Sequence, residues 1–116
     1  MKYLIEGKEL NVNGKSIKFD HLIRTVLEKD RVLVTLIMED DIPGLMKYYH
    51  SRNIFGVSAE GEILWQVEAP SDFKEDLFTS LGINNEDNVE AYSWKGCENI
   101  IDPKTGKILK QEFVRF

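Results

Sequence analysis

Residues that could carry nucleophilic chemistry are few in this chain. The single cysteine is Cys97, and the two histidines are His21 and His50. A catalytic cysteine or serine needs a histidine within hydrogen-bond reach, and the sequence holds no Gly-x-Ser-x-Gly motif that would expose a serine for attack. Because Cys97 follows Gly96 in a strand-like segment, we expect a small buried thiol and assign no catalytic residue.

The same side chains do not form a pattern of metal ligands. Structural zinc sites take four ligands at clustered spacings, and neither a Cys-x-x-Cys nor a His-x-x-x-His pair occurs. The acidic stretches 39–41 and 72–76 lack the alternating acids around a glycine that a calcium loop requires. The glycines are scattered singly and form no phosphate-binding loop. We therefore expect neither a metal site nor a cofactor site.

The segment 46–52, Met-Lys-Tyr-Tyr-His-Ser-Arg, is the best candidate for an interaction surface. Tyrosine and arginine are enriched at interface hot spots, because they bury large areas and still present polar tips. The segment follows an acidic turn, where an exposed connection is expected. We predict that Tyr48, Tyr49, His50 and Arg52 contact a partner. The alternative is that one or two of the aromatic residues pack on a sheet edge.

The two tryptophans, Trp65 and Trp94, are candidates for a stacking platform for a carbohydrate or another ligand. Trp65 lies in a repeated hairpin, and its counterpart in the other copy is Lys110. A position that accepts lysine faces solvent or a rim, so we expect Trp65 to be partly exposed. The alternative places both tryptophans in the core, since each would bury a large area.

The hairpin repeat that contains Trp65 spans 58–66 and recurs at 103–111, an offset of 45 residues. Both copies have Gly, a charged residue, Ile, Leu and Gln at equivalent positions, and each copy is preceded by Asn-Ile. A glycine at the turn followed by an apolar run is typical of a β-hairpin. Two units cannot close a propeller, so the repeat predicts a β architecture and does not itself indicate a reaction.

The remaining segments alternate between turn signals and short apolar or alternating runs. Asn13-Gly14 is a strong hairpin signal, and 32–38 is apolar and β-branched enough for a central strand covered on both faces. A helix through 23–38 is the alternative. Phe73, Leu77 and Leu81 recur at four-residue spacing, which predicts one short helix near 72–82. Strands are expected at 3–5, 9–12, 16–19, 23–28, 32–38, 53–57, 62–68, 89–94, 98–101 and 108–114.

These elements predict one β-rich domain over residues 1–116. The length suits a single core, and the composition is that of a globular protein, with 42% hydrophobic and 30% charged residues. The expected fold class is mainly β, an antiparallel meander that curls into a sandwich or a partly open barrel.

The charge balance limits the partners. With 15 basic and 20 acidic residues the net charge is -5. This disfavours nucleic acid and anionic membrane surfaces and permits docking to a basic protein. No run approaches the roughly 18 apolar residues that span a bilayer, the N-terminal segment lacks a signal-peptide pattern, and one cysteine suits a reducing compartment. We expect a soluble cytoplasmic protein of unknown oligomeric state.

The hairpins 58–65 and 102–109 resemble the outer hairpins of blades in quinoprotein-type β-propellers. In both, a polar or acidic residue precedes a turn that contains glycine, and an apolar strand follows the turn. Together with 53–57 and 92–96, the arrangement is similar to small bacterial β proteins of uncharacterised function. Quinoprotein propellers hold their cofactor with residues from many blades, and no such set is matched here, so the resemblance implies no cofactor.

The leading functional hypothesis is a small non-enzymatic binding protein. One form of it is an inhibitor or immunity-type protein that covers a basic partner. The alternative is a small hydrolase or ligand-binding protein with an aromatic pocket at the open end of the sheet, lined by Tyr92, Trp94 and His50. A structural subunit that adds edge strands to its neighbours is a third possibility.

Overall fold

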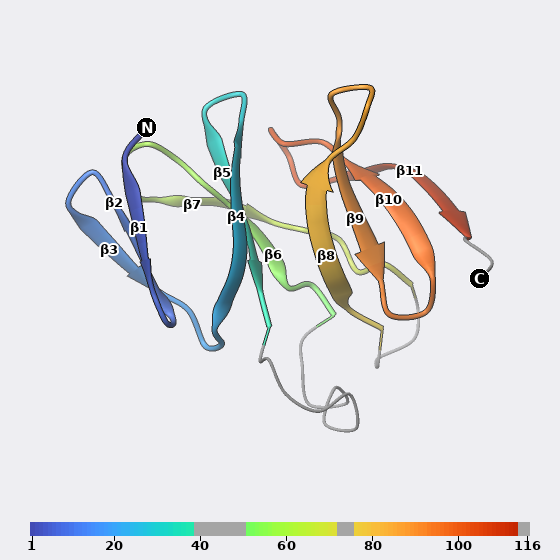
Figure 1. Ribbon diagram of the computed structural model, residues 1–116, viewed down its shortest axis with the longest axis horizontal. Coiled ribbons are helices and arrows are strands. Elements are labelled where there is room, and N and C mark those ends of the chain that lie inside the picture. The colour runs from blue at the N-terminus through green and yellow to red at the C-terminus, as the bar shows by residue number, and fades with distance from the viewer. Residues whose placement is uncertain (39–50, 72–75, 114–116) are drawn as a thin grey trace.

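The computed structural model describes residues 1–38, 51–71 and 76–113, and its regular structure there is antiparallel β throughout (Figure 1). The strands are β1 (Tyr3–Glu6), β2 (Glu9–Val12), β3 (Lys15–Lys18), β4 (Ile23–Lys29), β5 (Val32–Ile37), β6 (Ile54–Val57), β7 (Ile63–Gln66), β8 (Phe78–Ile83), β9 (Val89–Ser93), β10 (Cys97–Ile101) and β11 (Ile108–Phe113). The mainly β prediction is confirmed. Within these residues no helix is long and apolar enough to cross a membrane.

The strands form three consecutive sheets, each following the order of the chain. We call them the N-terminal sheet (β1-β2-β3), the central sheet (β4-β5-β6-β7) and the C-terminal sheet (β8-β9-β10-β11). The tight turn between β2 and β3 is the predicted Asn13-Gly14 hairpin, with φ of 50° and 89°. In the part of the chain that the structure describes, the meander divides into three sheets and closes no barrel.

The central sheet lies between the other two and supplies both cores. One core joins β5, β6 and β7 to the C-terminal sheet and includes Val34, Ile54 and Phe78. The other joins the opposite face of the central sheet to the N-terminal sheet and includes Leu10 and Leu33. All six residues of β5 are buried, which confirms the prediction of a strand covered on both faces.

The predicted helix near 72–82 is wrong where the structure describes it. Residues 78–83 form β8, paired with β9, while 72–75 lie outside the described residues. The register shifts between Phe78 and Ser80, where Phe78 pairs with Ser93 and Ser80 with Tyr92. A bulge adds one residue to a strand and reverses the alternation of its faces. Of the residues that predicted the helix, Leu77 lies before β8 and packs with Met38, whereas Leu81 packs against the core that contains Phe78, so their four-residue spacing does not mark one face of a helix.

The repeated hairpin holds neighbouring sheets together. Its glycines, Gly61 and Gly106, have φ of +75° and +76°. The turn with Gly61 lies against Lys15 of β3, and the turn with Gly106 lies against Trp65 of β7. Each turn thus contacts the last strand of the preceding sheet. The repeat specifies how one sheet is stacked on the next.

Trp65 fills the junction between the central and C-terminal sheets. A Cβ at Gly56 would lie 2.2 Å from the indole, and a Cβ at Gly106 would lie 2.4 Å from it. The indole Nε1 donates a hydrogen bond of 2.8 Å to the carbonyl of Pro103. Only 8% of Trp65 is exposed, so the expectation of a partly exposed side chain is wrong. The counterpart position in the C-terminal sheet, Lys110, has no fourth sheet to cover it among the described residues.

We predict that Gly106→Ala destabilises the protein more than Gly14→Ala. Both glycines have positive φ, which costs an L-residue about 1–2 kcal/mol. At Gly106 the methyl group also collides with Trp65, which adds about 1–3 kcal/mol of overpacking. No atom lies within 4 Å of a Cβ at Gly14. Urea denaturation of both variants measures the difference, and equal losses would contradict this account of the junction.

Candidate functional site

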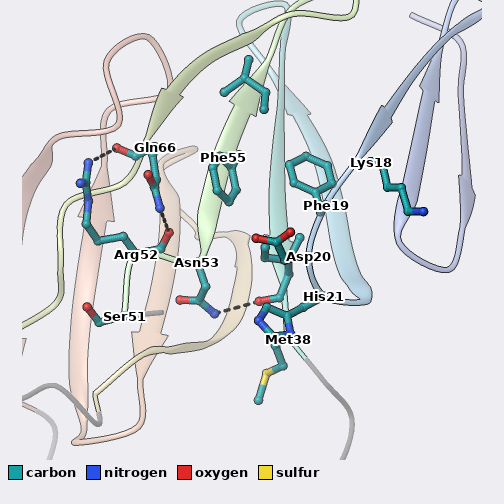
Figure 2. A pocket seen from close by; sticks show the side chains of 12 residues that line it. Lys18, Phe19, Asp20, His21, Met38, Ser51, Arg52, Asn53, Phe55 and Gln66 are labelled. Atoms are coloured by element: carbon teal, nitrogen blue, oxygen red, sulfur yellow. Dashed lines mark hydrogen bonds between the residues drawn. The ribbon is translucent and has the colours of Figure 1, made fainter. Parts of the chain in front are cut away.

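A pocket of about 540 Å³ opens between the N-terminal and central sheets, at the end where β5 stops and β6 begins (Figure 2). Its walls come from four parts of the chain: the end of β3 with the connection that follows it, the end of β5, the segment 51–55, and β7. The lining residues are Lys18, Phe19, Asp20, His21, Ile37, Met38, Ser51, Arg52, Asn53, Phe55, Ile63 and Gln66.

An aromatic pair lies in the middle of the pocket. The rings of Phe19 and Phe55 have centroids 5.2 Å apart and are tilted by 45°. Phe19 is buried and Phe55 is half-buried, and both extend the core between the N-terminal and central sheets. Figure 2 shows the two rings side by side, with polar side chains around them. The centre of the pocket is therefore apolar and suited to a ring-sized group.

Arg52 is fixed on one side of the aromatic pair. Its Nε donates to the carbonyl of Val67 at 2.8 Å and its Nη2 donates to the carbonyl of Gln66 at 3.3 Å. In return, the Gln66 side-chain amide donates to the carbonyl of Arg52 at 2.8 Å. These partners are neutral, so they hold the guanidinium in place without cancelling its charge. Lys18, Asp20 and His21 line the other side.

Asn53 holds the wall of the pocket to both neighbouring strands. Its side chain is buried, with 3% exposed. The amide nitrogen donates to the carbonyl of Ile37 at 3.0 Å and to that of Phe78 at 2.8 Å. The amide oxygen accepts from the backbone N–H of Phe78 at 2.9 Å. One side chain thus ties the end of β5 and the start of β8 to the start of β6, which fixes the backbone that carries Arg52 and Phe55.

The three predicted interaction residues that the structure describes, Arg52, Trp65 and Trp94, do not form one surface. Arg52 lines the pocket, whereas Trp65 is buried in the sheet junction. Trp94 is half exposed, at 50%, in the turn between β9 and β10. The prediction for Tyr48, Tyr49 and His50 falls outside the described residues.

The predicted aromatic pocket used Tyr92, Trp94 and His50, and His50 lies outside the described residues. Tyr92 and Trp94 belong to the C-terminal sheet and its turn, and neither lines the space between the N-terminal and central sheets. A stacking platform that uses Trp65 together with Trp94 is excluded by the burial of Trp65.

Three pocket residues, Ser51, His21 and Asp20, have the side-chain types of a hydrolytic triad. A nucleophile must lie within hydrogen-bond reach of its base. Figure 2 shows the Ser51 hydroxyl on one side of Asn53 and the His21 ring on the other, so the two are not paired. The only cysteine, Cys97, is fully buried, and burial raises the pKa of its thiol. A raised pKa keeps the thiol protonated and inert at neutral pH.

A group of acidic residues covers the outer face of the C-terminal sheet. Glu98 pairs with Tyr92 on one side and with Glu112 on the other, and Glu90 lies two residues from Tyr92, on the same face of the sheet. A hydrogen bond with the Glu90 carboxyl, followed by desolvation and the charges of Glu90 and Glu112, raises the pKa of Glu98. Burial and the charges of Glu90 and Glu98 raise the pKa of Tyr92. In the described residues no group of three or more His, Cys, Asp or Glu side chains is arranged to hold a metal ion.

Sequence reasoning did not find Phe19, Phe55 and Asn53 as site residues. Phe19 directly follows β3 and Phe55 lies in β6, and their local sequence does not indicate that the two rings are in contact. Asn53 does leave a signal, because Asn-Ile precedes both copies of the hairpin. Its counterpart Asn99 is also buried and donates to the carbonyls of Ala91 and Cys97 at 3.2 Å. A repeated asparagine in an apolar strand indicates a buried hydrogen-bonding position.

Comparison with known proteins identifies a family and a fold. A family model described as "Domain of unknown function (DUF7957)" matches residues 1–113. No curated protein matches the chain. Among solved structures, the chain is similar to the crystal structure of the computationally designed Ika8 protein, with a TM-score of 0.57 and 13% identity. The match covers 90% of this chain and 30% of the designed protein, so the likeness concerns the fold alone.

We predict that Asn53→Ala lowers the free energy of unfolding by about 2–4 kcal/mol. The change leaves two buried carbonyls and one buried N–H without their partner, and each unsatisfied group is costly. Asn88→Ala, at an exposed position in the turn before β9, is the control and should change stability by less than about 0.5 kcal/mol. Urea denaturation tests both variants, and a similar small effect for the two would contradict the role assigned to Asn53.

We predict that Glu98→Gln raises the melting temperature at neutral pH. The raised pKa means that ionised Glu98 is less favourable in the folded chain than in the unfolded chain. The loss of folding stability caused by ionised Glu98 is fully present above the folded-state pKa and is absent below the ordinary glutamate pKa. The increase in melting temperature of Glu98→Gln over the wild type should therefore become smaller as the pH falls through the raised pKa. Calorimetry at several pH values, with Glu60→Gln as the control, tests this, and a gain that does not depend on pH would refute it.

Proposed function

The chain belongs to the family described as a domain of unknown function (DUF7957), and we propose that it is a small non-catalytic binding protein. In this proposal the ligand site is the pocket between the N-terminal and central sheets. Its ligand carries a ring-sized apolar group that packs on Phe19 and Phe55 and an acidic group that faces Arg52 or Lys18.

The observation that carries the proposal is the apolar centre with fixed polar groups around it. A volume of about 540 Å³ falls within the range of roughly 300–1,000 Å³ that is usual for small-molecule sites. The Arg52 guanidinium and the Gln66 amide are held by hydrogen bonds before any ligand arrives. Such preorganisation lowers the entropic cost of binding. The pocket therefore meets the general requirements of a binding site.

The charge of the pocket determines the expected class of ligand. Lys18 and Arg52 carry positive charge and Asp20 carries negative charge, while His21 is neutral in the formal count. The pocket thus has a small positive balance in a chain whose net charge is -5. A positive site in an acidic protein favours an acid over an amine of the same shape. Since Ser51 and His21 are not paired, the proposal includes no hydrolysis.

The inhibitor or immunity-type function, with a basic protein as partner, is a second candidate. Its support is the acidic outer face of the C-terminal sheet, where Glu90 and Glu98 repel one another. A cation from a partner would relieve that repulsion. The reducing environment suited to a single cysteine makes the cytoplasm the expected location for either function.

We predict that phenylacetate perturbs the amide NMR signals of the pocket segments 18–21 and 51–55, and that 2-phenylethylamine does so much more weakly. The two probes share a ring and differ in the sign of their charge. Lys18→Glu should weaken binding of phenylacetate by about threefold or more, because one exposed charge is reversed beside the ligand. Lys107→Glu is the matched control, since it changes the net charge equally in a turn of the C-terminal sheet.

Two results would contradict the proposed function. One is equal perturbation by the acid and the amine, which would remove the charge argument. The other is perturbation confined to residues outside the pocket, which would remove the site. An equal loss of affinity in Lys18→Glu and Lys107→Glu would show that only the overall charge of the chain matters.

A further inference from the structure

β11 is an exposed edge strand at the end of the three-sheet stack. It pairs with β10 on one side, and the order of the C-terminal sheet places no described strand on its other side. Figure 1 shows it at the outer margin of the molecule. Its first residue is partly covered, because the N–H of Ile108 donates to the Glu68 carboxylate at 2.7 Å. The stretch 109–113 leaves a row of backbone groups available for pairing.

Two apolar side chains of this strand are strongly exposed. Leu109 is 65% exposed and Phe113 is 80% exposed. Natural edge strands are commonly protected by inward-pointing charges, proline or bulges, and a long exposed apolar edge tends to pair with another strand. The five residues 109–113 contain no proline, and the bulge in the pairing of β11 with β10 lies at Leu109, where the stretch begins. This edge is therefore suited to the addition of a strand.

We propose that two copies of the chain associate by antiparallel pairing of their β11 strands, centred on Gln111. The sequence Leu-Lys-Gln-Glu-Phe is self-complementary in that register. Lys110 lies opposite Glu112 of the second copy, and Leu109 lies opposite Phe113 of the second copy. The twofold symmetry repeats both pairs, so one interface gains two ion pairs and two apolar pairs.

The acidic outer face gives an independent reason for this register. Along one rung of the C-terminal sheet, Tyr92, Glu98 and Glu112 lie side by side. In the proposed dimer the next member of that rung is Lys110 of the second copy. Its ammonium group approaches carboxylates that otherwise repel one another. In the single chain Lys110 is exposed and bonds Glu112 of its own strand at 3.1 Å, so it is free to exchange partners at the surface.

Among the remaining edge strands, β1 has several exposed apolar side chains but is a weaker candidate. It has four residues where β11 has six, and its apolar side chains are less exposed, at 40% for Tyr3 and 57% for Leu4. Antiparallel pairing centred on Leu4 would match Glu6 with Lys2, which lies outside the strand. Charge reversal at Lys2 is therefore a control for charge reversal at Lys110.

Sedimentation equilibrium at physiological salt tests the proposal on the full chain. At this ionic strength the Debye length is about 8 Å, so the net repulsion between two acidic chains is largely screened. We expect a concentration-dependent dimer for the wild type. Lys110→Glu and Glu112→Lys should each weaken it by about tenfold or more, because each turns two attractive pairs into repulsive ones. The double variant restores opposite charges and should regain the wild-type association.

The remaining outcomes decide against the proposal. A wild-type chain that is monomeric up to millimolar concentration overturns it. A dimer that resists both single changes, or one that Lys2→Glu weakens as much as Lys110→Glu does, lies on another surface and also overturns it. A double variant that stays as weak as the single variants rules out the Gln111-centred register. Circular dichroism of every variant tests whether the β fold is kept. Neither sedimentation equilibrium nor circular dichroism depends on a ligand in the pocket.

Discussion

The buried amide of Asn53 is the interaction on which the arrangement of the site depends. The cores between the sheets are apolar and fix distance more than register. Asn53 adds direction, because its three hydrogen bonds specify where the start of β6 lies relative to the end of β5 and the start of β8. Since Arg52 and Phe55 flank it, the same bonds position a cation and an aromatic ring at the pocket. A polar side chain in the core thus links the stacking of the sheets to the geometry of the candidate site.

Stacking itself follows from a repeated contact between hairpins. In the central and C-terminal sheets, a glycine turn lies on the last strand of the preceding sheet, at Lys15 in one case and at Trp65 in the other. The central sheet has a neighbour on each face, which explains why β5 is buried throughout. The outer face of the C-terminal sheet carries the carboxylates of Glu90 and Glu98. Its edge strand β11 keeps apolar side chains exposed, so the edge and the face have different properties.

Local structure was largely predictable from the sequence, and the site was not. Turn glycines, alternation and the β-branched run at β5 depend on near neighbours, so the hairpins and the central strand were found. The helix near 72–82 was predicted wrongly because Leu77 and Leu81, four residues apart, pack in two different apolar clusters and not on one helix face. The pocket brings together Phe19 and Phe55 across two sheets, and only the tertiary fold creates that pair. The likeness to propeller blades stays a prediction.

The central claim is that the aromatic pair between the N-terminal and central sheets is a ligand site. Intermolecular nuclear Overhauser effects between phenylacetate and the protein test it most directly, since they arise only from protons that are close in space. We predict contacts from the ligand ring to the ring protons of both Phe19 and Phe55, and from its methylene group to the side chain of Arg52. Contacts to the exposed indole of Trp94, with none to either phenylalanine, would contradict the claim.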